Sequence, residues 1–206
     1  MIELLSDALN CIVGLLCFVL ALVRLNRVRS RPWLTLTFSY GCNLFALVYW
    51  SGYSVVFGET PRYFYVSELG WAAMYVFIIM LLAECDNKRE YAQPVRVAWI
   101  PVVVSALLFV LIVYLAGNVP LNLADNGLMA VMGYFAVKGL FAEPSPNFSG
   151  NRAYSASVLV FVIAELALWT ASCFYSTTPI PYIALSNVLT ASTIGMLVCA
   201  WKSEQV

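Results

Sequence analysis

Seven long apolar stretches, separated by short polar connections, constrain this chain more than any other feature of its sequence. Each stretch holds about 20 residues, the length that an α-helix needs to cross the hydrocarbon core of a bilayer. The connections carry the Pro, Gly, Asn and charged residues that end helices. The sequence therefore predicts an all-α fold, a polytopic membrane bundle of seven transmembrane helices. The expected spans are residues 6–25, 33–57, 64–84, 97–116, 123–141, 154–175 and 180–201. The fifth is the weakest, because its apolar centre is short.

Composition agrees with a chain made almost entirely of membrane spans. Of its 206 residues, 62% are hydrophobic and 11% are charged, whereas soluble domains average about half apolar. Seven spans use roughly 140 positions, so we expect a single transmembrane domain over residues 1–206 with no soluble module. The formal net charge is zero, which argues against a nucleic-acid partner.

The distribution of cations predicts the orientation of the bundle. If seven spans alternate, every Lys and Arg except Arg62 lies on one side, and cytoplasmic loops carry such an excess. The cations on that side are Arg24, Arg27, Arg29, Arg31, Lys88, Arg89, Arg96, Lys138, Arg152 and Lys202. The first span begins after acidic residues and ends in arginines, the reverse of a cleaved signal peptide. We therefore expect a multi-pass protein of the cell membrane (inner or plasma), with its N-terminus outside and its C-terminus in the cytoplasm.

The chain contains no histidine, which narrows its chemistry. Histidine-ligated haem, histidine-ligated zinc and a Ser-His-Asp triad are all excluded. The six cysteines lack CxxC spacing and lie mostly within apolar stretches, so we interpret them as small hydrophobic side chains. We expect no metal and no cofactor, and we favour a protein that is not an enzyme while leaving that question open.

Two pairs of spans resemble each other, which suggests an internal repeat. The second and third spans contain FSYGCNLFALVYW and ETPRYFYVSELGW, and the sixth and seventh contain VFVIAELALWTAS and TTPIPYIALSNVLTAS. On alignment Asn43 meets Glu165, the two Thr-Pro turns coincide and, with one gap, Glu68 meets Asn187. Spans 1–3 and 5–7 would then be parallel repeats joined by span 4, and substrate sites tend to lie where such repeats meet. Chance similarity among apolar segments is the alternative.

Polar and aromatic residues within the spans form the candidate ligand-binding site. Ionisable groups are costly inside a membrane and normally face the interior of a bundle. Glu165 lies near the middle of the sixth span, and Glu68 lies in the outer third of the third. Helical spacing places an aromatic and an amide or hydroxyl near each acid, as in a pocket for a small amphipathic or cationic molecule. The predicted ligand-binding residues are Glu165, Glu68, Asn43, Asn187, Trp50, Trp71, Trp169, Tyr53 and Tyr75.

A structural role is the alternative for these polar residues. Asn, Ser, Thr and a protonated Glu can hydrogen-bond between helices, and for Asn43 and Asn187 this interpretation is as good as a functional one. Asp7 and Asp125 are expected to be solvated helix ends, because each lies at the outer end of its span. Asp125 falls in the first turn of the expected fifth span, where the helix dipole favours an anion.

Spans 5–7 contain YFAVKGLFA, then SVLVFVIAELAL and a following turn with proline. In these motifs the C-terminal half resembles the YhhN (lysoplasmalogenase-like) membrane family. Members of that family have eight helices, and carry Gly-Asp and Ser-Asp where this chain has Cys42-Asn43 and Ala164-Glu165. The resemblance implies a hydrolase of lysolipid vinyl ethers that works through paired acids. Here those acids would be Glu165 and, in place of the amide Asn43, Glu68.

In architecture the expected bundle is similar to the SWEET and PnuC-like transporters. The shared features are seven helices with the N-terminus outside, a three-plus-one-plus-three repeat and paired asparagines. The chain lacks the Pro-Gln signature of those transporters. The similarity implies transport of a small molecule through a site between the two repeats.

Three functions therefore stay open for this sequence. The first, which we favour, is a transporter or receptor-like sensor that binds a small molecule or lipid in a polar pocket between two helical repeats. The second is a lysolipid hydrolase of the YhhN type. The third is a non-catalytic subunit of a membrane complex. The expected partners are the lipid bilayer and the ligand, with a homo-oligomer or a membrane partner subunit left open.

Overall fold

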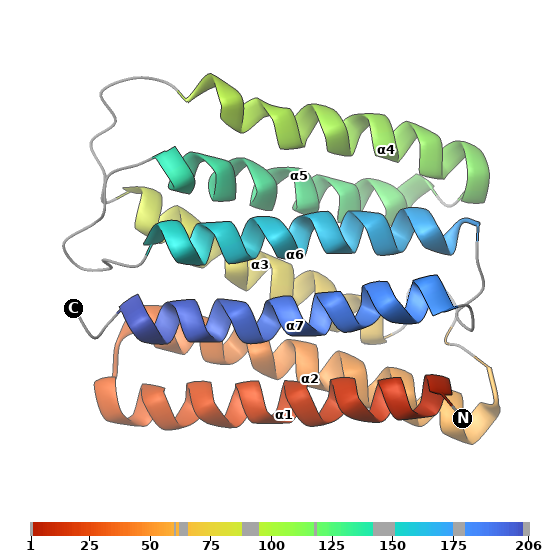
Figure 1. Cartoon of the computed structure of the whole chain (residues 1–206), viewed down its shortest axis with the longest axis horizontal. Coiled ribbons are helices and arrows are strands. Elements are labelled where there is room, and N and C mark those ends of the chain that lie inside the picture. Colours follow the sequence, from red (N-terminus) through yellow and green to blue (C-terminus); the bar gives the residue numbers. More distant parts are fainter. Residues whose placement is uncertain are drawn as a thin grey trace. The chain divides into compact units, whose positions relative to one another are not determined.

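The computed structural model describes residues 2–59, 61, 66–87, 95–117, 119–141, 151–174 and 180–203, and every regular element within these ranges is helical. The all-α prediction is therefore confirmed, and each of the seven apolar stretches overlaps one α-helix (Figure 1). The elements are α1 (Ile2–Val28), α2 (Arg31–Phe57), α3 (Val66–Asn87), the 3-10 helix η1 (Arg96–Trp99), α4 (Ile100–Ala116), α5 (Val119–Phe141), α6 (Asn151–Ser172) and α7 (Ile180–Ser203).

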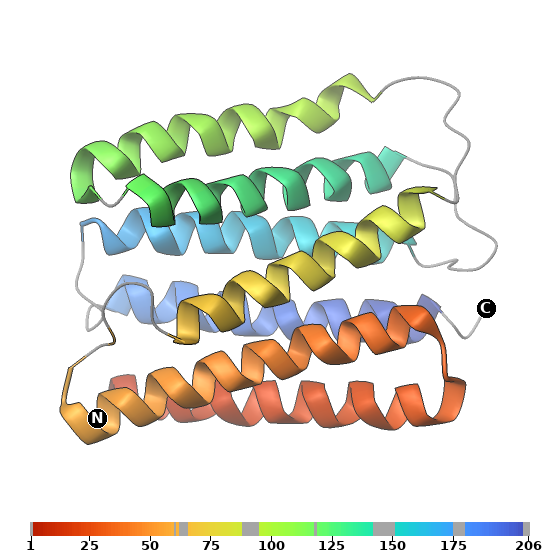
Figure 2. The same cartoon turned by 180° about the vertical axis from the view of Figure 1, so that it is seen from behind.

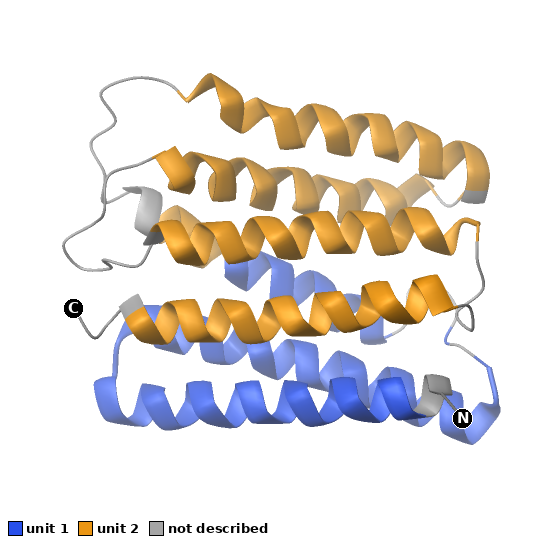
Figure 3. Cartoon of the chain, in the orientation of Figure 1, with its two compact units in different colours: residues 1–78 blue, residues 79–206 orange. Residues whose placement is uncertain are grey.

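The chain divides into two compact units, Met1–Ile78 and Ile79–Val206 (Figure 3). Unit 1 contains α1, α2 and the first part of α3, and unit 2 contains the rest of α3, η1 and helices α4 to α7. Within unit 1, α1 and α2 lie against each other, and Cys11 Sγ is 3.4 Å from Ser51 Oγ across their contact.

The backbone between α1 and α2 explains where the first helix ends and the second begins. Arg29 has a left-handed φ of 52°, and its N–H donates to the Leu25 carbonyl at the end of α1. Pro32 then lies in the first turn of α2, where its missing N–H costs nothing. At the other end of α2, Gly58 has a φ of 71°, a conformation that glycine adopts without steric penalty.

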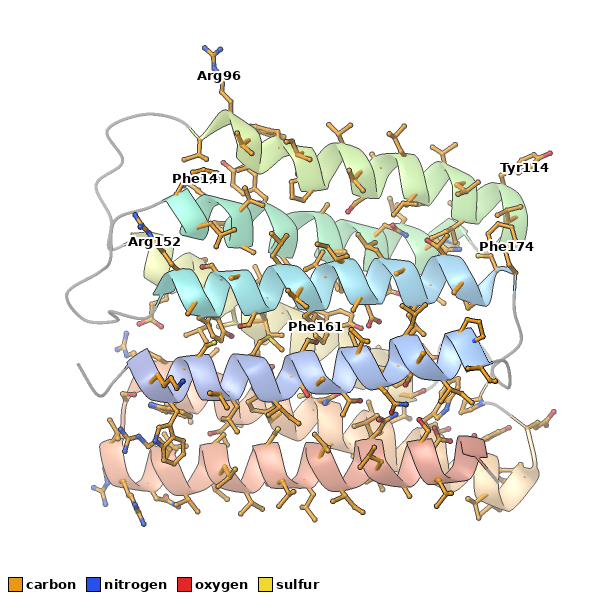
Figure 4. All side chains as sticks on the ribbon, in the orientation of Figure 1. Arg96, Tyr114, Phe141, Arg152, Phe161 and Phe174 are labelled. Atoms are coloured by element: carbon orange, nitrogen blue, oxygen red, sulfur yellow. The ribbon has the colours of Figure 1, made fainter. Side chains whose placement is uncertain are left out.

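Helices α4, α5, α6 and α7 of unit 2 lie side by side in chain order, and each runs antiparallel to the next (Figures 1 and 2). Because of this alternation, Arg96, Lys138, Arg152 and Lys202 lie at the same end of the unit. Figure 4 shows Arg96, Phe141 and Arg152 at that end, and Tyr114 and Phe174 at the opposite end. The structure thus gathers the described cations of α4–α7 at one end of their helices.

Five of the described helical segments are long and apolar enough to cross a membrane. They are Leu5–Val28, Val66–Glu84, Arg96–Leu115, Arg152–Ser172 and Ile180–Lys202. The two α-helices outside this set are α2 and α5. The weakness of α5 was expected from its short apolar centre. The weakness of α2 was not, and follows from the Ser, Asn, Tyr and Trp residues along it.

Helices α1 and α4 expose many large apolar side chains. On α1 the exposed side chains include Leu5, Leu9, Ile12, Leu16 and Leu20. On α4 they include Val103, Leu107 and Val110. Soluble proteins rarely expose continuous apolar surface of this extent, so these helices are compatible with a multi-pass membrane protein.

Candidate functional site

The predicted site residues belong to two groups, one in each unit. In unit 1 lie Asn43, Trp50 and Tyr53 of α2 and Glu68, Trp71 and Tyr75 of α3. In unit 2 lie Glu165 and Trp169 of α6 and Asn187 of α7.

In unit 1, α2 and α3 approach each other closely at Gly70. A methyl group on Gly70 would lie 2.9 Å from Ala46 Cβ and 3.0 Å from the Cys42 carbonyl oxygen, so only glycine fits. One turn along α3, Ser39 Oγ donates to the Met74 carbonyl at 3.3 Å. The small residues at this crossing bring the two backbones together, as is common between membrane helices.

This crossing positions Asn43 and the two tryptophans of the predicted site. Asn43 is buried and follows Cys42, whose carbonyl faces Gly70. The Trp50 and Trp71 rings contact each other, with centroids 5.6 Å apart and planes tilted by 49°. The structure therefore brings the Trp50 and Trp71 rings together, and Asn43 lies about two helical turns before Trp50 on α2.

Glu68 lies at the start of α3 and is partly exposed. Its Oε2 accepts a hydrogen bond of 2.8 Å from Ser67 Oγ, and Ser67 itself is fully buried. Tyr75 is buried two turns further along α3. Tyr53 is half-buried and contacts Phe57, with ring centroids 4.5 Å apart.

In unit 2, Gly133 of α5 marks where three helices meet. A methyl group on Gly133 would lie 2.6 Å from Pro101 Cβ of α4 and 3.7 Å from Val162 Cγ1 of α6. A second close approach relates α7 to α6, because a methyl group on Gly195 would lie 3.9 Å from Ser157 Cβ of α6. These contacts determine which residues of neighbouring helices lie at the same depth.

Glu165 and Asn187 lie at the same depth on adjacent helices. Each is eight residues from the Ser157–Gly195 contact, about 12 Å towards the end of unit 2 that carries Tyr114. Glu165 is only 5% exposed, whereas Asn187 is half-buried. Glu165 is not central in its helix, because α6 starts earlier than expected: the residue lies about 21 Å from the first residue of α6 and about 10 Å from the last.

Asp125 is not the solvated helix end that the sequence predicted. Helix α5 begins at Val119, so Asp125 lies in its second turn and is 5% exposed. The earlier start is supported by Asn122, whose Nδ2 donates to the Gly117 carbonyl at 2.7 Å. Asp7 is partly buried near the start of α1.

Asn122 and Asn126 are buried polar residues that the sequence alone did not assign to the site. With Asp125 and Met129 they follow the i, i+3, i+4, i+7 spacing of one helix face, and all four are buried. That spacing could have identified them, but the hydropathy of the segment made it look like a helix boundary. Asn126 lies at the depth of Trp169, because each is seven residues from the Gly133–Val162 contact.

Many hydroxyl groups near the site bond within their own helix. Thr170 donates to the Leu166 carbonyl at 2.7 Å, and Thr190 donates to the Ser186 carbonyl at 3.1 Å. Ser192 and Thr193 donate in the same way to carbonyls three residues earlier. Such bonds satisfy a hydroxyl in an apolar environment without a partner helix, so burial alone does not make these residues interhelical ties.

The described residues contain no group of three His, Cys, Asp or Glu side chains that could hold a metal ion. In unit 2, the chemistry of the buried residues is thus that of carboxyl, amide and hydroxyl groups surrounded by apolar and aromatic side chains. These groups can hydrogen-bond a polar ligand or provide oxygen atoms to a cation. In comparisons with known proteins, no protein-family model, no curated protein and no solved structure matches the chain.

Proposed function

We propose that this chain is a seven-span membrane protein that binds a small amphipathic or cationic molecule among buried polar side chains, as a transporter or receptor-like sensor. The observation that carries the proposal is the burial of Glu165 and Asp125 in unit 2, with Glu165 at the depth of Asn187. Acids buried in membrane helices are expensive and usually mark ligand or ion pathways.

The two weakest spans fit this proposal because their polar residues are buried. Helices α2 and α5 contain 27 and 23 residues, which gives lengths of about 40 and 34 Å, enough to cross a bilayer. On α2 the buried polar residues include Ser39 and Asn43, and on α5 they include Asn122, Asp125 and Asn126. Polar groups shielded from lipid lower the mean hydropathy of a helix without preventing it from crossing.

The proposed orientation has the N-terminus outside and the C-terminus in the cytoplasm. The support is the common position of Arg96, Lys138, Arg152 and Lys202 at one end of unit 2, since cytoplasmic ends of membrane helices are rich in Lys and Arg. The polar residues Glu165 and Asn187 are then nearer the outer surface. A repeat of α1–α3 and α5–α7 remains part of the proposal, although its Thr60, Thr178 and Pro179 lie outside the described residues.

The proposal is tested by ligand-induced stabilisation of purified protein in nanodiscs. The probes are choline, ethanolamine, lysophosphatidylcholine and lysophosphatidylethanolamine, each of which carries an ammonium group on a small or amphipathic body. We expect at least one probe to raise the thermal unfolding midpoint and to lose this effect in Glu165→Gln and Glu68→Gln. Glu59→Gln is the control, because Glu59 is exposed beyond the end of α2. An equal response of wild type and Glu165→Gln, or none to any probe, contradicts the proposal.

A hydrolase of the YhhN type is the second candidate. The observation that favours it is the burial of the Glu165 carboxyl group, whereas Glu68 is partly exposed, since general acid–base hydrolysis needs two acids with different roles. In this function Glu165 and Glu68 would be the catalytic pair. Incubation of the protein with lysoplasmalogen and lysophosphatidylcholine, followed by mass spectrometry of aldehyde and head group, decides it. Product that is absent from Glu165→Gln supports hydrolysis, and no product from either lipid excludes it.

A further inference from the structure

The α4–α5–α6 junction of unit 2 brings three oxygen-bearing side chains onto facing surfaces. Ser105 follows Pro101 by four residues on α4, and Asn126 precedes Gly133 by seven on α5. Glu165 follows Val162 by three on α6. Spacings of three, four and seven keep a residue on one helix face, so each of the three side chains shares the face through which its helix meets the others.

These side chains also lie at similar depths. Because neighbouring helices are antiparallel, all three residues are displaced from the Gly133 contact towards the same end of unit 2. At 1.5 Å per residue the displacements are about 4 to 5 Å for Glu165, about 6 Å for Ser105 and about 10 Å for Asn126. The three therefore span about one helical turn.

Two of these side chains have oxygen atoms without a hydrogen-bond partner. Ser105 is 1% exposed and Asn126 is 3% exposed, and neither Ser105 Oγ nor Asn126 Oδ1 has a partner among the described residues. The Nδ2 of Asn126 donates to the Asn122 carbonyl of its own helix at 3.0 Å, which leaves its oxygen directed away from that bond. Buried oxygen atoms without a partner are costly, so a group or ion that binds to them would stabilise the protein.

The charge of the junction favours a cation as the bound species. The described buried residues include Asp125 and Glu165 but no Lys or Arg. Carboxyl, amide and hydroxyl oxygens are the ligands that hard cations and ammonium groups accept. We propose that Ser105, Asn126 and Glu165 bind a small monovalent cation through their side-chain oxygens, either Na⁺ or the ammonium group of an organic ligand. This cation site deepens the proposed function and rests on it for the placement of α4–α6 in a membrane.

The test measures cation-dependent stability of the whole protein in nanodiscs. NaCl and methylammonium chloride are titrated separately at constant ionic strength, with N-methylglucamine chloride as the replacement salt. A cation present at ten times its dissociation constant raises the unfolding midpoint by about 3–6 °C for a chain of this size. The same titrations are repeated on Ser105→Ala, Asn126→Ala and Glu165→Gln.

We expect each variant to raise the half-maximal cation concentration about tenfold, since each removes or neutralises one oxygen ligand. The matched control is Ser157→Ala, because the Ser157 hydroxyl already donates to the Tyr154 carbonyl at 2.7 Å. Should Glu165→Gln fail to fold, Ser105→Ala still decides the question, because it deletes a single oxygen atom.

The outcomes separate the two sources of the cation. A response to Na⁺ alone assigns the site to an inorganic ion, and a response to methylammonium alone assigns it to the ammonium group of a ligand. No response to either salt, or a response unchanged in all three variants, overturns the cation site. If that happens while Glu165→Gln still abolishes the effect of choline, ethanolamine or a lysolipid, the proposed function stands without it. If a cation raises the unfolding midpoint but none of those four probes does, the cation site stands and the proposed ligand class is rejected.

Discussion

Buried polar side chains in this protein differ in how far their own helix satisfies them. Hydroxyls such as those of Thr170 and Thr190 donate to a carbonyl four residues earlier and need nothing more. An amide has two donors and an acceptor, so one helix cannot satisfy it completely. Asn122 uses its Nδ2 to bond the Gly117 carbonyl before α5, whereas Asn126 bonds only along the helix and leaves Oδ1 without a partner.

This difference predicts opposite effects of the same substitution at two positions of α5. In buffers free of Na⁺ and ammonium, Asn126→Leu removes a buried oxygen that has no partner, and we expect the free energy of unfolding to stay equal or to increase. Asn122→Leu removes the bond to Gly117 and should lower it by about 1 kcal/mol. Reversible unfolding in mixed detergent micelles, titrated with a denaturing detergent, measures both. A larger loss in the free energy of unfolding for Asn126→Leu than for Asn122→Leu would show that the Asn126 side chain stabilises the fold through its hydrogen bonds.

The contact between Trp50 and Trp71 predicts an energetic coupling between α2 and α3. Their centroid separation of 5.6 Å is in the range where aromatic pairs contribute about 0.5–1.5 kcal/mol beyond burial. A double-mutant cycle of Trp50→Ala and Trp71→Ala should therefore give a coupling of that size. The control cycle pairs Trp50→Ala with Phe38→Ala, which lies twelve residues earlier on the same helix, about 18 Å away. Equal couplings in the two cycles would contradict a specific ring contact.

At the scale of helices, apolar stretches located the elements well and their ends less well. The expected span 33–57 corresponds to α2 (Arg31–Phe57), and 180–201 corresponds to α7 (Ile180–Ser203). The expected span 123–141 began four residues late, because hydropathy detects the apolar part of a helix. The first eight residues of α5 include Asn122, Asp125 and Asn126, which lower the hydropathy there. Whether such residues are buried depends on the helices packed against them, which a single sequence does not reveal.

For the candidate site, too, the sequence pattern indicates some residues, whereas others depend on how the helices pack. The cost of an acid in a membrane made Glu165 a candidate, and the register of α6 and α7 places Asn187 at its depth. Asn122, Asp125 and Asn126 were missed or interpreted as a helix end. Their helical spacing is visible in the sequence, but their burial becomes evident only once α5 is known to start at Val119 and to meet α4 and α6 at Gly133.

Two glycines of α5 give a matched test of that meeting point. A methyl group on Gly133 would lie 2.6 Å from Pro101 Cβ, whereas one on Gly127 would have no neighbour within 4 Å. We expect Gly133→Ala to lower the free energy of unfolding by about 1–3 kcal/mol through overpacking. Gly127→Ala should be neutral or stabilise by up to about 1 kcal/mol, because alanine favours the helix. Detergent unfolding curves compare the two, and similar losses at both positions would contradict the contact.

At the scale of the whole chain, membrane embedding depends on how polar groups are distributed, and mean hydropathy alone is a poor guide. Helices α1 and α4 expose apolar side chains along most of their length. Helices α2 and α5 fall below the hydropathy of the five candidate spans, yet they bury their amides and Asp125. The sequence predicted seven spans from length and charge alternation, and the decisive question is whether α2 and α5 cross.

Cysteine accessibility answers that question for each helix separately. Arg29 and Glu59 are exposed at the two ends of α2. For α5 the corresponding exposed positions belong to its neighbours in the chain: Tyr114 near the end of α4 and Arg152 near the start of α6. Single cysteines are placed at these positions in a background whose native cysteines are replaced by alanine. Intact cells are then labelled with a membrane-impermeant maleimide, before and after permeabilisation.

If both helices cross and the N-terminus is outside, Glu59→Cys and Tyr114→Cys label in intact cells. Arg29→Cys and Arg152→Cys then label only after permeabilisation, because the cation-rich ends of the helices face the cytoplasm. Equal labelling of Tyr114→Cys and Arg152→Cys would mean that α5 does not cross, and equal labelling of Arg29→Cys and Glu59→Cys would mean the same for α2. Reversal of both pairs would preserve seven spans and invert the orientation, which would move Glu165 and Asn187 to the cytoplasmic half of the membrane.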